Sequence, residues 1–305
     1  MGERHAKGSP GDAGRMRPEL STRAAGLPLR RQTLGPDELR LHWLGQAGFL
    51  LEWEDQRILI DAYLSDWLAQ ENRGKSLPHL RLMPSPADPK ALRDITYSLA
   101  THAHPDHLDP GSLPVLQEGN PGCRFVVPRA EAGTAEALGL KPQRLVLVNA
   151  GETIPLGASA RLSAIASAHE DLATDGAGNY RNLGYVMSLG PFTLYHSGDC
   201  VPYEGLAASL LPFGIQICLL PVNGRDEKRT SLGIIGNFTM EESIELAKSI
   251  GSEFLLGHHF GLFDFNTVDP REYSRIIREG NAWLASRYML VEAGIEYRFR
   301  VPGGT

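Results

Sequence analysis

Short hydrophobic runs bounded by polar turns recur along this chain and predict β-strands. Three of them, Leu39–Trp43, Gly48–Trp53 and Arg57–Ile60, follow one another closely, and a polar Glu-Asp-Gln turn joins the last two. Several later runs are almost continuously apolar, as expected of strands that are covered on both faces. The further predicted strands are Asp94–Ala100, Arg124–Val127, Arg144–Val148, Ala160–Ala166, Leu183–Ser188, Phe192–Tyr195, Ile215–Val222 and Glu253–Leu256.

Helical periodicity is clearest over Met240–Ile250, whose apolar residues recur on one face. Thr239 stands at the N-cap of this segment and Glu242 follows three residues later, which is the signature of a capping box. Helices are also predicted over Ala130–Leu138 and after Asp269-Pro270, since proline is favoured at the first helical position. The chain therefore combines predicted strands with predicted helices.

The first 30 residues are rich in glycine, proline and scattered charges, and they predict a flexible N-terminal arm over residues 1–30. Residues 31–305 show no internal repeat and no clear boundary, so we expect one domain there. The connection from Ala62 to Lys90 carries several prolines and little periodicity. A connection of that length usually borders a functional site.

Composition and net charge argue against several classes of partner and location. The formal net charge of −6 argues against a nucleic-acid partner bound through a broad basic surface. The three cysteines, Cys123, Cys200 and Cys218, form no CxxC pair, which predicts a reducing, cytoplasmic location. No apolar run approaches the ~18 residues that a membrane span needs, so no membrane association is expected. Association into a homo-oligomer is compatible with the sequence.

The segment Thr101–Asp109 reads Thr-His-Ala-His-Pro-Asp-His-Leu-Asp and directly follows a predicted strand. Imidazoles and carboxylates are the ligands that borderline divalent metals prefer. In an extended loop His102 and His104 point the same way and can share one metal. Asp106 and His107 then turn toward a second position. We predict a metal-binding loop here rather than a chance polar turn.

Further candidate ligands also follow predicted strands. His169 and Asp199 each stand shortly after one, and the pair His258 and His259 follows another. The carboxylate of Asp61 follows the strand Arg57–Ile60, either as an ordinary turn residue or as a hydrogen-bond partner that fixes the tautomer of a ligand imidazole. If these strand ends converge at one edge, they form a site with several ligands.

The histidine-rich loop, the isolated later histidine and the Ser-Gly-Asp segment resemble the metallo-β-lactamase-fold hydrolases. The resemblance implies an αββα sandwich of two mixed β-sheets with outer helices and a two-metal site at one edge. It favours His259 over His258, because His259-Phe-Gly-Leu-Phe is similar to the pattern after the last ligand in that family. The implied ligands are His102, His104 and His169 for the first metal, Asp106, His107 and His259 for the second, and Asp199 as the bridge.

Four segments, Trp43–Phe49, Asp61–Asp66, Asn223–Asp226 and Ile235–Thr239, are similar to the branch that contains L-ascorbate-6-phosphate lactonase. The resemblance implies a hydrolase that uses a metal-bound hydroxide on a small anionic substrate, such as a sugar-phosphate lactone or a similar ester. Zinc or manganese is the expected metal, with iron as a further candidate.

Within that chemistry Asp106 is the expected proton acceptor and Asp199 the bridging catalytic carboxylate. Asn223 and Arg225 are the expected substrate contacts, because a guanidinium clamps a phosphate or carboxylate through two hydrogen bonds. The competing interpretation pairs Arg225 with Asp226 in a solvated turn. Two other functions use the same ligands: a metal-dependent phosphodiesterase or nuclease, which the net charge disfavours on nucleic acid, and a di-iron redox protein.

Overall fold

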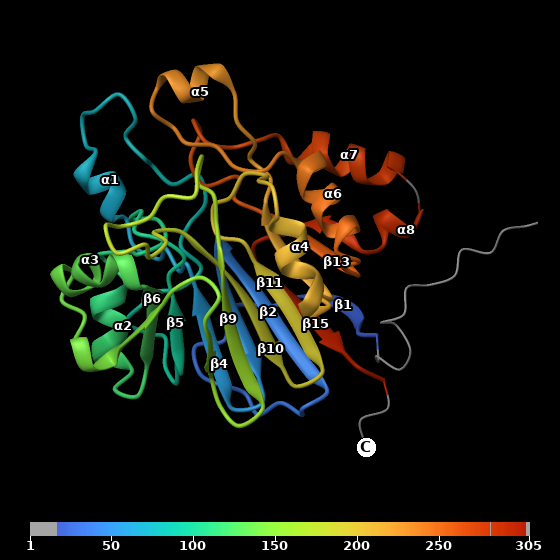
Figure 1. The fold of residues 1–305 in the computed structure, drawn as a ribbon, viewed down its shortest axis with the longest axis horizontal. Helices are drawn as coiled ribbons and strands as arrows, with labels where there is room; N and C mark the ends of the chain where they lie inside the picture. The colour runs from blue at the N-terminus through green and yellow to red at the C-terminus, as the bar shows by residue number, and fades with distance from the viewer. Residues whose placement is uncertain (1–16, 281, 303–305) are drawn as a thin grey trace, which may run out of the picture.

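The computed structural model describes residues 17–280 and 282–302 and consists of two β-sheets packed face to face, with helices on their outer sides (Figure 1). This is the predicted α/β sandwich of two mixed sheets. Each sheet contains both antiparallel and parallel strand pairs. Of the helices described, none is long and apolar enough to cross a membrane.

Within the described residues the first sheet has eight strands, in the order β1-β15-β2-β3-β4-β5-β6-β7. Their bounds are β1 Glu19–Ala24, β2 Glu38–Gly45, β3 Gly48–Trp53, β4 Gln56–Ile60, β5 Tyr97–Leu99, β6 Arg124–Pro128, β7 Leu145–Val148 and β15 Ile295–Arg300. The second sheet has seven strands there, in the order β14-β13-β12-β11-β10-β9-β8. Their bounds are β8 Thr153–Pro155, β9 Ala160–Ala166, β10 Leu183–Leu189, β11 Phe192–His196, β12 Ile217–Pro221, β13 Phe254–His258 and β14 Tyr288–Leu290.

The helices cover the outer faces of the two sheets: α2 and α3 lie against the first sheet, and α4, α6, α7 and α8 lie on the side of the second (Figure 1). The bounds are α1 Trp67–Glu71, α2 Leu113–Gly119, α3 Ala132–Ala137, α4 Leu206–Leu210, α5 Glu227–Ser231, α6 Met240–Ser249, α7 Pro270–Gly280 and α8 Ala282–Ala285. Short 3₁₀ turns occupy Arg129–Glu131, Pro142–Arg144 and Leu211–Phe213.

Strand β3 shows how the sequence builds two layers of core. Its side chains alternate between the faces of the sheet. Phe49, Leu51 and Trp53 join the core between the two sheets, whereas Leu50 joins the separate core beneath α2. Each of these side chains is buried, and burial of a large apolar side chain contributes roughly 1.5–3 kcal/mol. A fully buried strand therefore needs the apolar run that predicted it.

The prediction of a flexible arm over residues 1–30 is wrong for Glu19–Ala24. This segment forms β1 and pairs antiparallel with β15. The pairing escaped the sequence analysis because all of its side chains except Leu20 are exposed, which leaves no hydrophobic pattern. An ion pair between Arg23 and Glu296, 2.8 Å long, joins the two strands. Residues 1–16 of the predicted arm lie outside the described residues.

The predicted helix starts are confirmed at α6 and α7. The hydroxyl of Thr239 accepts a hydrogen bond from the Glu242 amide at 3.3 Å, and the Thr239 amide donates to the Glu242 carboxylate at 2.9 Å. Helix α7 begins at Pro270. The helix predicted over Ala130–Leu138 is confirmed over Ala132–Ala137, after a single 3₁₀ turn.

Strand direction sets where the site forms. Strands β4 and β5 are parallel neighbours in the first sheet, and β11, β12 and β13 are parallel in the second. Strand β9 runs the same way as β11, since both are antiparallel to β10. Segments that follow these strands therefore emerge at one edge of each sheet, as the sequence analysis expected.

Candidate metal centre

The loop Thr101–Asp109 follows β5 and folds tightly on itself. The amide of His107 donates to the carbonyl of His104 at 2.9 Å, so the two imidazoles are fixed within one turn. Asp109, at the end of the loop, is fully buried and accepts hydrogen bonds from the Ser112 hydroxyl at 2.5 Å and the Gly111 amide at 2.8 Å. Asp109 therefore anchors the loop, while the histidines face outward from it.

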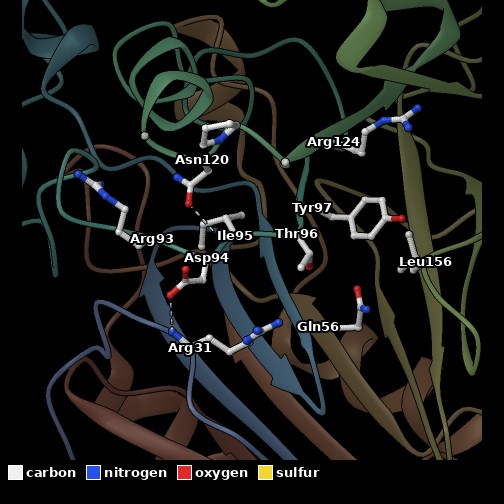
Figure 2. A pocket seen from close by; sticks show the side chains of 13 residues that line it. Arg31, Gln56, Arg93, Asp94, Ile95, Thr96, Tyr97, Asn120, Arg124 and Leu156 are labelled. Carbon is white, nitrogen blue, oxygen red and sulfur yellow. Dashed lines mark hydrogen bonds between the residues drawn. The ribbon is translucent and has the colours of Figure 1, made fainter.

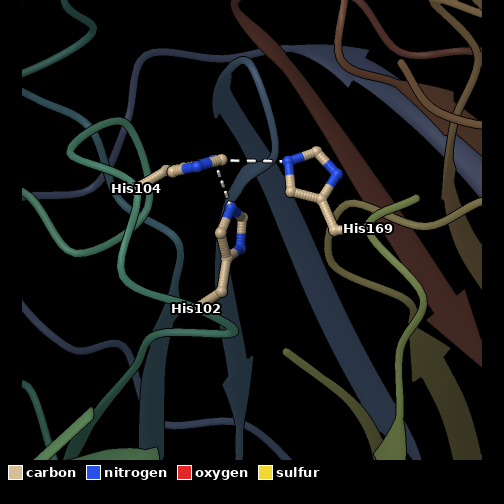
Figure 3. Close-up of side chains that lie close together, drawn as sticks. All are labelled: His102, His104 and His169. Atoms are coloured by element: carbon tan, nitrogen blue, oxygen red, sulfur yellow. Dashed lines mark hydrogen bonds between the residues drawn. The ribbon is translucent and has the colours of Figure 1, made fainter. Parts of the chain in front are cut away.

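One group of imidazoles brings together two segments of the chain. Nε2 of His102 lies 3.0 Å from Nδ1 of His104, and Nε2 of His169 lies 3.3 Å from the same atom (Figure 3). His169 comes from the loop after β9 in the second sheet, whereas the other two come from the first. One ligand atom from each residue lies within 4.8 Å of the others, close enough to hold a metal ion.

A second group lies beside the first. Asp106, His107 and His259 also offer ligand atoms within 4.8 Å of one another. Asp199 stands between the two groups: its Oδ1 lies 3.1 Å from Nε2 of His259 and 3.4 Å from Nε2 of His107. Its Oδ2 lies 3.8 Å from Nε2 of His169. Each oxygen of Asp199 thus faces a different group.

Asp61 fixes the orientation of His107. Its Oδ2 lies 2.7 Å from Nδ1 of His107, which leaves Nε2 of that ring toward the cluster. The amide of Thr101 donates to the other oxygen of Asp61 at 2.8 Å, and the Thr101 hydroxyl donates to Oδ2 at 2.7 Å. Both Asp61 and His107 are buried. The hydrogen bond to an imidazole that the sequence suggested for Asp61 is therefore present.

Unpaired polar atoms indicate what the cluster lacks. Nε2 of His107, Oδ1 of Asp199 and Nε2 of His259 are buried, and although each imidazole lies 3.1–3.4 Å from the carboxylate, none of these atoms has a partner in hydrogen-bond geometry among the described residues. Buried polar groups are normally paired, because each unpaired group loses its interaction with water without compensation. Five imidazoles and two carboxylates that converge with free ligand atoms fit two divalent cations.

The electrostatics of the cluster agree with that fit. Burial and the neighbouring imidazoles lower the pKa of His102 well below its usual value, and burial lowers the pKa of His169 to about 4. Both rings are therefore neutral at pH 7, which is the form that binds metals. Although burial would raise it, the pKa of Asp199 is held well below its usual range by His259 and His107.

His107 carries the opposite shift. Burial lowers its pKa, but the carboxylates of Asp199, Asp61 and Asp106 outweigh burial and hold that pKa well above the usual value. Three carboxylates around one imidazole amount to an excess of negative charge in a buried place. Bound cations would neutralise that excess, as they do in metal sites generally.

The structure separates His259 from His258. The ring of His258 stacks on His196, with centroids 5.0 Å apart and planes 16° apart, and meets the edge of Phe49 at 5.4 Å. His258 therefore belongs to the packing beneath the cluster, and His259 belongs to the cluster. The backbone of His259 has φ +68°, a left-handed conformation that few residues other than glycine adopt.

Gln46 contacts the cluster, although the sequence analysis assigned it no role. The side-chain Nε2 of Gln46 donates to Oδ2 of Asp106 at 2.9 Å, and its backbone carbonyl accepts from the amide of His259 at 3.0 Å. The indole N–H of Trp43 donates to the same carbonyl at 2.9 Å. Gln46 lies in one of the segments that resemble the lactonase branch, which was the available signal.

The predicted substrate contacts Asn223 and Arg225 pair with other residues of the chain, and their contact with a substrate stays a prediction. The guanidinium of Arg225 forms hydrogen bonds of 2.7 and 2.6 Å with the two oxygens of Glu242. The competing pairing of Arg225 with Asp226 is wrong, since Asp226 pairs with Arg229 at 2.5 Å. Asn223 is buried and donates to the side chain of Asn266 at 2.8 Å. Neither predicted contact is placed at the cluster.

A pocket of about 260 Å³ opens onto the cluster and includes His104, Asp106, His169 and Asp199 in its lining. Its walls come from three segments that are distant in sequence: the connection before β5, the loop before α6, and the loop after β13. Wall residues from these segments include Leu77 and His79, Leu232 and Ile234, and Phe263 and Phe265.

A larger hollow of about 490 Å³ lies at the starts of β4, β5 and β6, whereas the cluster follows the ends of β4 and β5 (Figure 2). Its lining includes Arg31, Arg93 and Arg124. The carboxylate of Asp94, also in this lining, accepts from the amide of Arg31 at 3.3 Å. The hollow with clustered arginines is therefore at the opposite end of these strands from the cluster.

Comparisons with known proteins agree with the fold. Residues 56–260 match the family model described as "Beta-lactamase superfamily domain". A "metal-dependent hydrolase" of Methanosarcina mazei is 26% identical over 245 residues, which cover 79% of this chain and 91% of the relative. A "Probable L-ascorbate-6-phosphate lactonase" of Escherichia fergusonii is 23% identical over 275 residues, covering 80% of this chain and 75% of the relative.

Solved structures with a similar fold include an isothiocyanate hydrolase from Delia radicum gut bacteria, with a TM-score of 0.68 and 17% identity over 86% of this chain and 99% of that one. A metallo hydrolase from the archaeon Ignicoccus hospitalis has a TM-score of 0.62 and 17% identity, also over 86% of this chain and 99% of that one. At these identities the similarity concerns the fold.

Proposed function

The chain belongs to the beta-lactamase superfamily and is a metal-dependent hydrolase, and from this premise we propose that it cleaves an ester or lactone bond of a small molecule at the two-group cluster. The observation that carries the proposal is the position of Asp199, whose two oxygens face the two groups from between them. A pocket of about 260 Å³ next to this carboxylate is of a size for a small substrate.

We propose that the metal ligands form two sets, which correspond to the two groups of side chains described above. His102, His104 and His169 would hold one divalent cation, Asp106, His107 and His259 would hold the other, and Asp199 would contact both. Zinc or manganese suits this set of imidazoles and carboxylates, with iron as a further candidate. When bound, such cations would make water a nucleophile near neutral pH and would polarise the scissile carbonyl.

The chain's own residues orient this chemistry. Asp106 lines the pocket and is held through one oxygen by Gln46, which positions the carboxylate to accept a proton. Asp61 holds the ring of His107, so that Nε2 faces the cluster and Nδ1 does not. Because both partners are buried and hydrogen-bonded, little rearrangement is needed when ligands bind.

A sugar-phosphate lactone is one member of the proposed substrate class. The relative named as a lactonase supports it, since the match extends over 80% of this chain. Arg225, the expected phosphate clamp, gives this substrate no support, because its guanidinium is hydrogen-bonded to the carboxylate of Glu242. Phosphodiesters form the main competing class and belong in the same screen.

The test is elemental analysis of the purified protein, followed by a screen of lactones, carboxylic esters, phosphate esters and phosphodiesters with each metal restored. We expect close to two equivalents of bound metal and hydrolysis of lactones or esters. Asp199→Ala should lose turnover, whereas Asp55→Ala, at the exposed turn between β3 and β4, should retain it. Turnover of phosphodiesters alone, or undiminished activity of Asp199→Ala, would overturn the proposal.

A further inference from the structure

We infer that the substrate is uncharged away from its reacting bond and carries an apolar substituent. This inference rests on the proposed function, because it concerns what the pocket at the same cluster accepts. It replaces the anionic substrate expected from the sequence with a neutral one, such as an alkyl- or aryl-substituted lactone or ester.

The walls of the pocket are predominantly apolar. Apart from the cluster, its described lining offers the hydrocarbon side chains of Leu68, Leu77, Leu232, Ile234, Phe263 and Phe265. His79 and Asn266 are the polar side chains among the rest of that lining. Specific small-molecule sites combine an apolar wall with a few polar groups that orient the ligand, and this lining has that composition.

The aromatic part of the wall is packed into a fixed arrangement. The rings of Phe263 and Phe265 stack with centroids 5.6 Å apart and planes 2° apart. The imidazole of His79 meets Phe263 edge-on at 5.2 Å and Phe265 at 4.7 Å, and its Nδ1 lies 2.7 Å from the carbonyl of Leu77. A wall held in this way presents an apolar surface without paying much side-chain entropy when a ligand binds.

Apart from the cations proposed at the cluster, the described lining offers no positive charge that could hold a phosphate. No lysine or arginine belongs to the part of the pocket that the structure describes. Arg229 reaches Asn266 at 3.4 Å, but Asp226 pairs with that guanidinium at 2.5 Å. Arg225 is paired with Glu242. A substrate phosphate that entered the pocket would lose water without a guanidinium to replace it, which is costly for an ion.

Three arginines line a different hollow, at the opposite end of these strands from the cluster. The hollow that holds Arg31, Arg93 and Arg124 lies at the starts of β4, β5 and β6 (Figure 2). The cluster follows the ends of β4 and β5. A ligand held by those arginines would lie a strand's length away from the reacting groups.

The test uses γ-lactones whose alkyl substituent grows one methylene at a time, with a phosphorylated lactone of matched length. Binding to the metal-free full-length protein is followed by calorimetry, and turnover is followed with the metal restored. We expect affinity to rise by up to about fourfold for each methylene until the pocket is filled, because each buried methylene contributes about 0.8 kcal/mol. The phosphorylated lactone should bind at least ~10-fold more weakly than its neutral counterpart, since its charge is unpaired there.

Two variants locate the effect. Leu232→Ala, at the rim of the pocket, and Phe265→Ala, in its wall, should flatten the dependence of affinity on alkyl length. Leu211→Ala is the matched control, because Leu211 is 54% exposed and Leu232 is 50% exposed, and Leu211 is not in the pocket lining. Leu232 is exposed enough that its truncation should leave folding intact.

The possible outcomes distinguish failure of this inference from failure of the proposed function. Affinity that ignores alkyl length, or tighter binding of the phosphorylated lactone, would overturn the inference even if the enzyme hydrolyses lactones. Length-dependent binding that both pocket variants abolish would support the inference. If that binding appears but the metal-loaded enzyme hydrolyses no ester or lactone, the apolar specificity stands and the proposed hydrolysis fails.

Discussion

The carboxylate of Asp61 lies 2.7 Å from Nδ1 of His107, and both side chains are withdrawn from solvent. The carboxylate follows β4 and the imidazole lies in the loop after β5. Because these two strands are parallel neighbours, the residues that follow them lie side by side. The backbone of Asp61 is left-handed, with φ +44°. The site therefore depends on a residue type that tolerates this conformation and also carries an acceptor.

Asp61→Asn tests whether this pair orients a metal ligand. Asparagine also tolerates a left-handed backbone, so the substitution changes the charge and one acceptor with little strain. Loss of such a partner typically costs 10–100-fold in metal affinity or activity. We expect a metal dissociation constant raised by about that factor, measured by competition with a chromophoric chelator.

Asp66→Asn is the control for this variant, because that side chain is 66% exposed in the same connection. It should bind metal as the unmodified protein does. Equal metal affinity for Asp61→Asn and the unmodified protein would show that the pair is not part of the metal centre.

His104→Ala should abolish turnover and weaken metal retention while the fold remains. His104 is exposed, so its truncation opens no cavity in the core. The free energy of unfolding of the metal-free variant should stay within about 0.5 kcal/mol of the unmodified protein. Metal content after dialysis and the unfolding midpoint in urea are the two measurements. Full activity in this variant would mean that the ligand set is wrong.

Gln46→Leu tests the contact with Asp106. The substitution removes the donor that lies 2.9 Å from Oδ2 of that carboxylate and keeps a side chain of similar size. We expect kcat to fall by about 10–100-fold, with a smaller change in KM, because positioning of Asp106 matters more than binding. Gln70→Leu, at an exposed position of α1, should leave both constants unchanged. A change in KM alone would assign Gln46 to substrate binding instead.

Acid should destabilise the fold through His42. Burial lowers the pKa of this imidazole to about 4, although Glu296, 3.7 Å away, raises it. In the unfolded chain its pKa is about 6.5. Between these values the unfolded chain binds more protons than the native one, so stability falls as pH drops from about 6.5 toward 4.

Below pH 4 this difference in the pKa of His42 lowers the free energy of unfolding by roughly 3 kcal/mol, and above pH 7 it has no effect. Urea unfolding of the metal-free protein at pH 7 and pH 4.5 measures it. His42→Gln should lose much less stability over that interval than the unmodified protein. Identical losses in the two proteins would place the acid sensitivity elsewhere.

Local signals predicted most of the cluster. The spacing of His102, His104, Asp106 and His107 is visible within one loop, because their convergence requires only a turn after a strand. The capping box of α6 is local in the same sense. That His169 and Asp199 would join them depended on strand order and direction, for which the resemblance to a known fold supplied the prediction.

The tertiary contact of Arg225 could not be predicted from the sequence. Its position after a strand suggested a clamp, but Glu242, already recognised as a capping residue, also accepts both arms of the guanidinium. A pairing across the structure leaves no periodic trace in the chain. The strands β8 and β14, of three residues each, are too short for a pattern, whereas Ile295, Tyr297 and Phe299 of β15 do alternate and were overlooked.

His102 and His259 reach the same cage from opposite sheets, each at the end of a strand whose neighbours must already be paired. The first sheet and the loops after its strands offer only part of the ligand set, because His169, Asp199 and His259 follow strands of the second sheet. Cation capture should therefore come after the sheets have docked, as a late event in biogenesis. A bound ion would therefore slow unfolding of the finished protein, and it would not nucleate its folding.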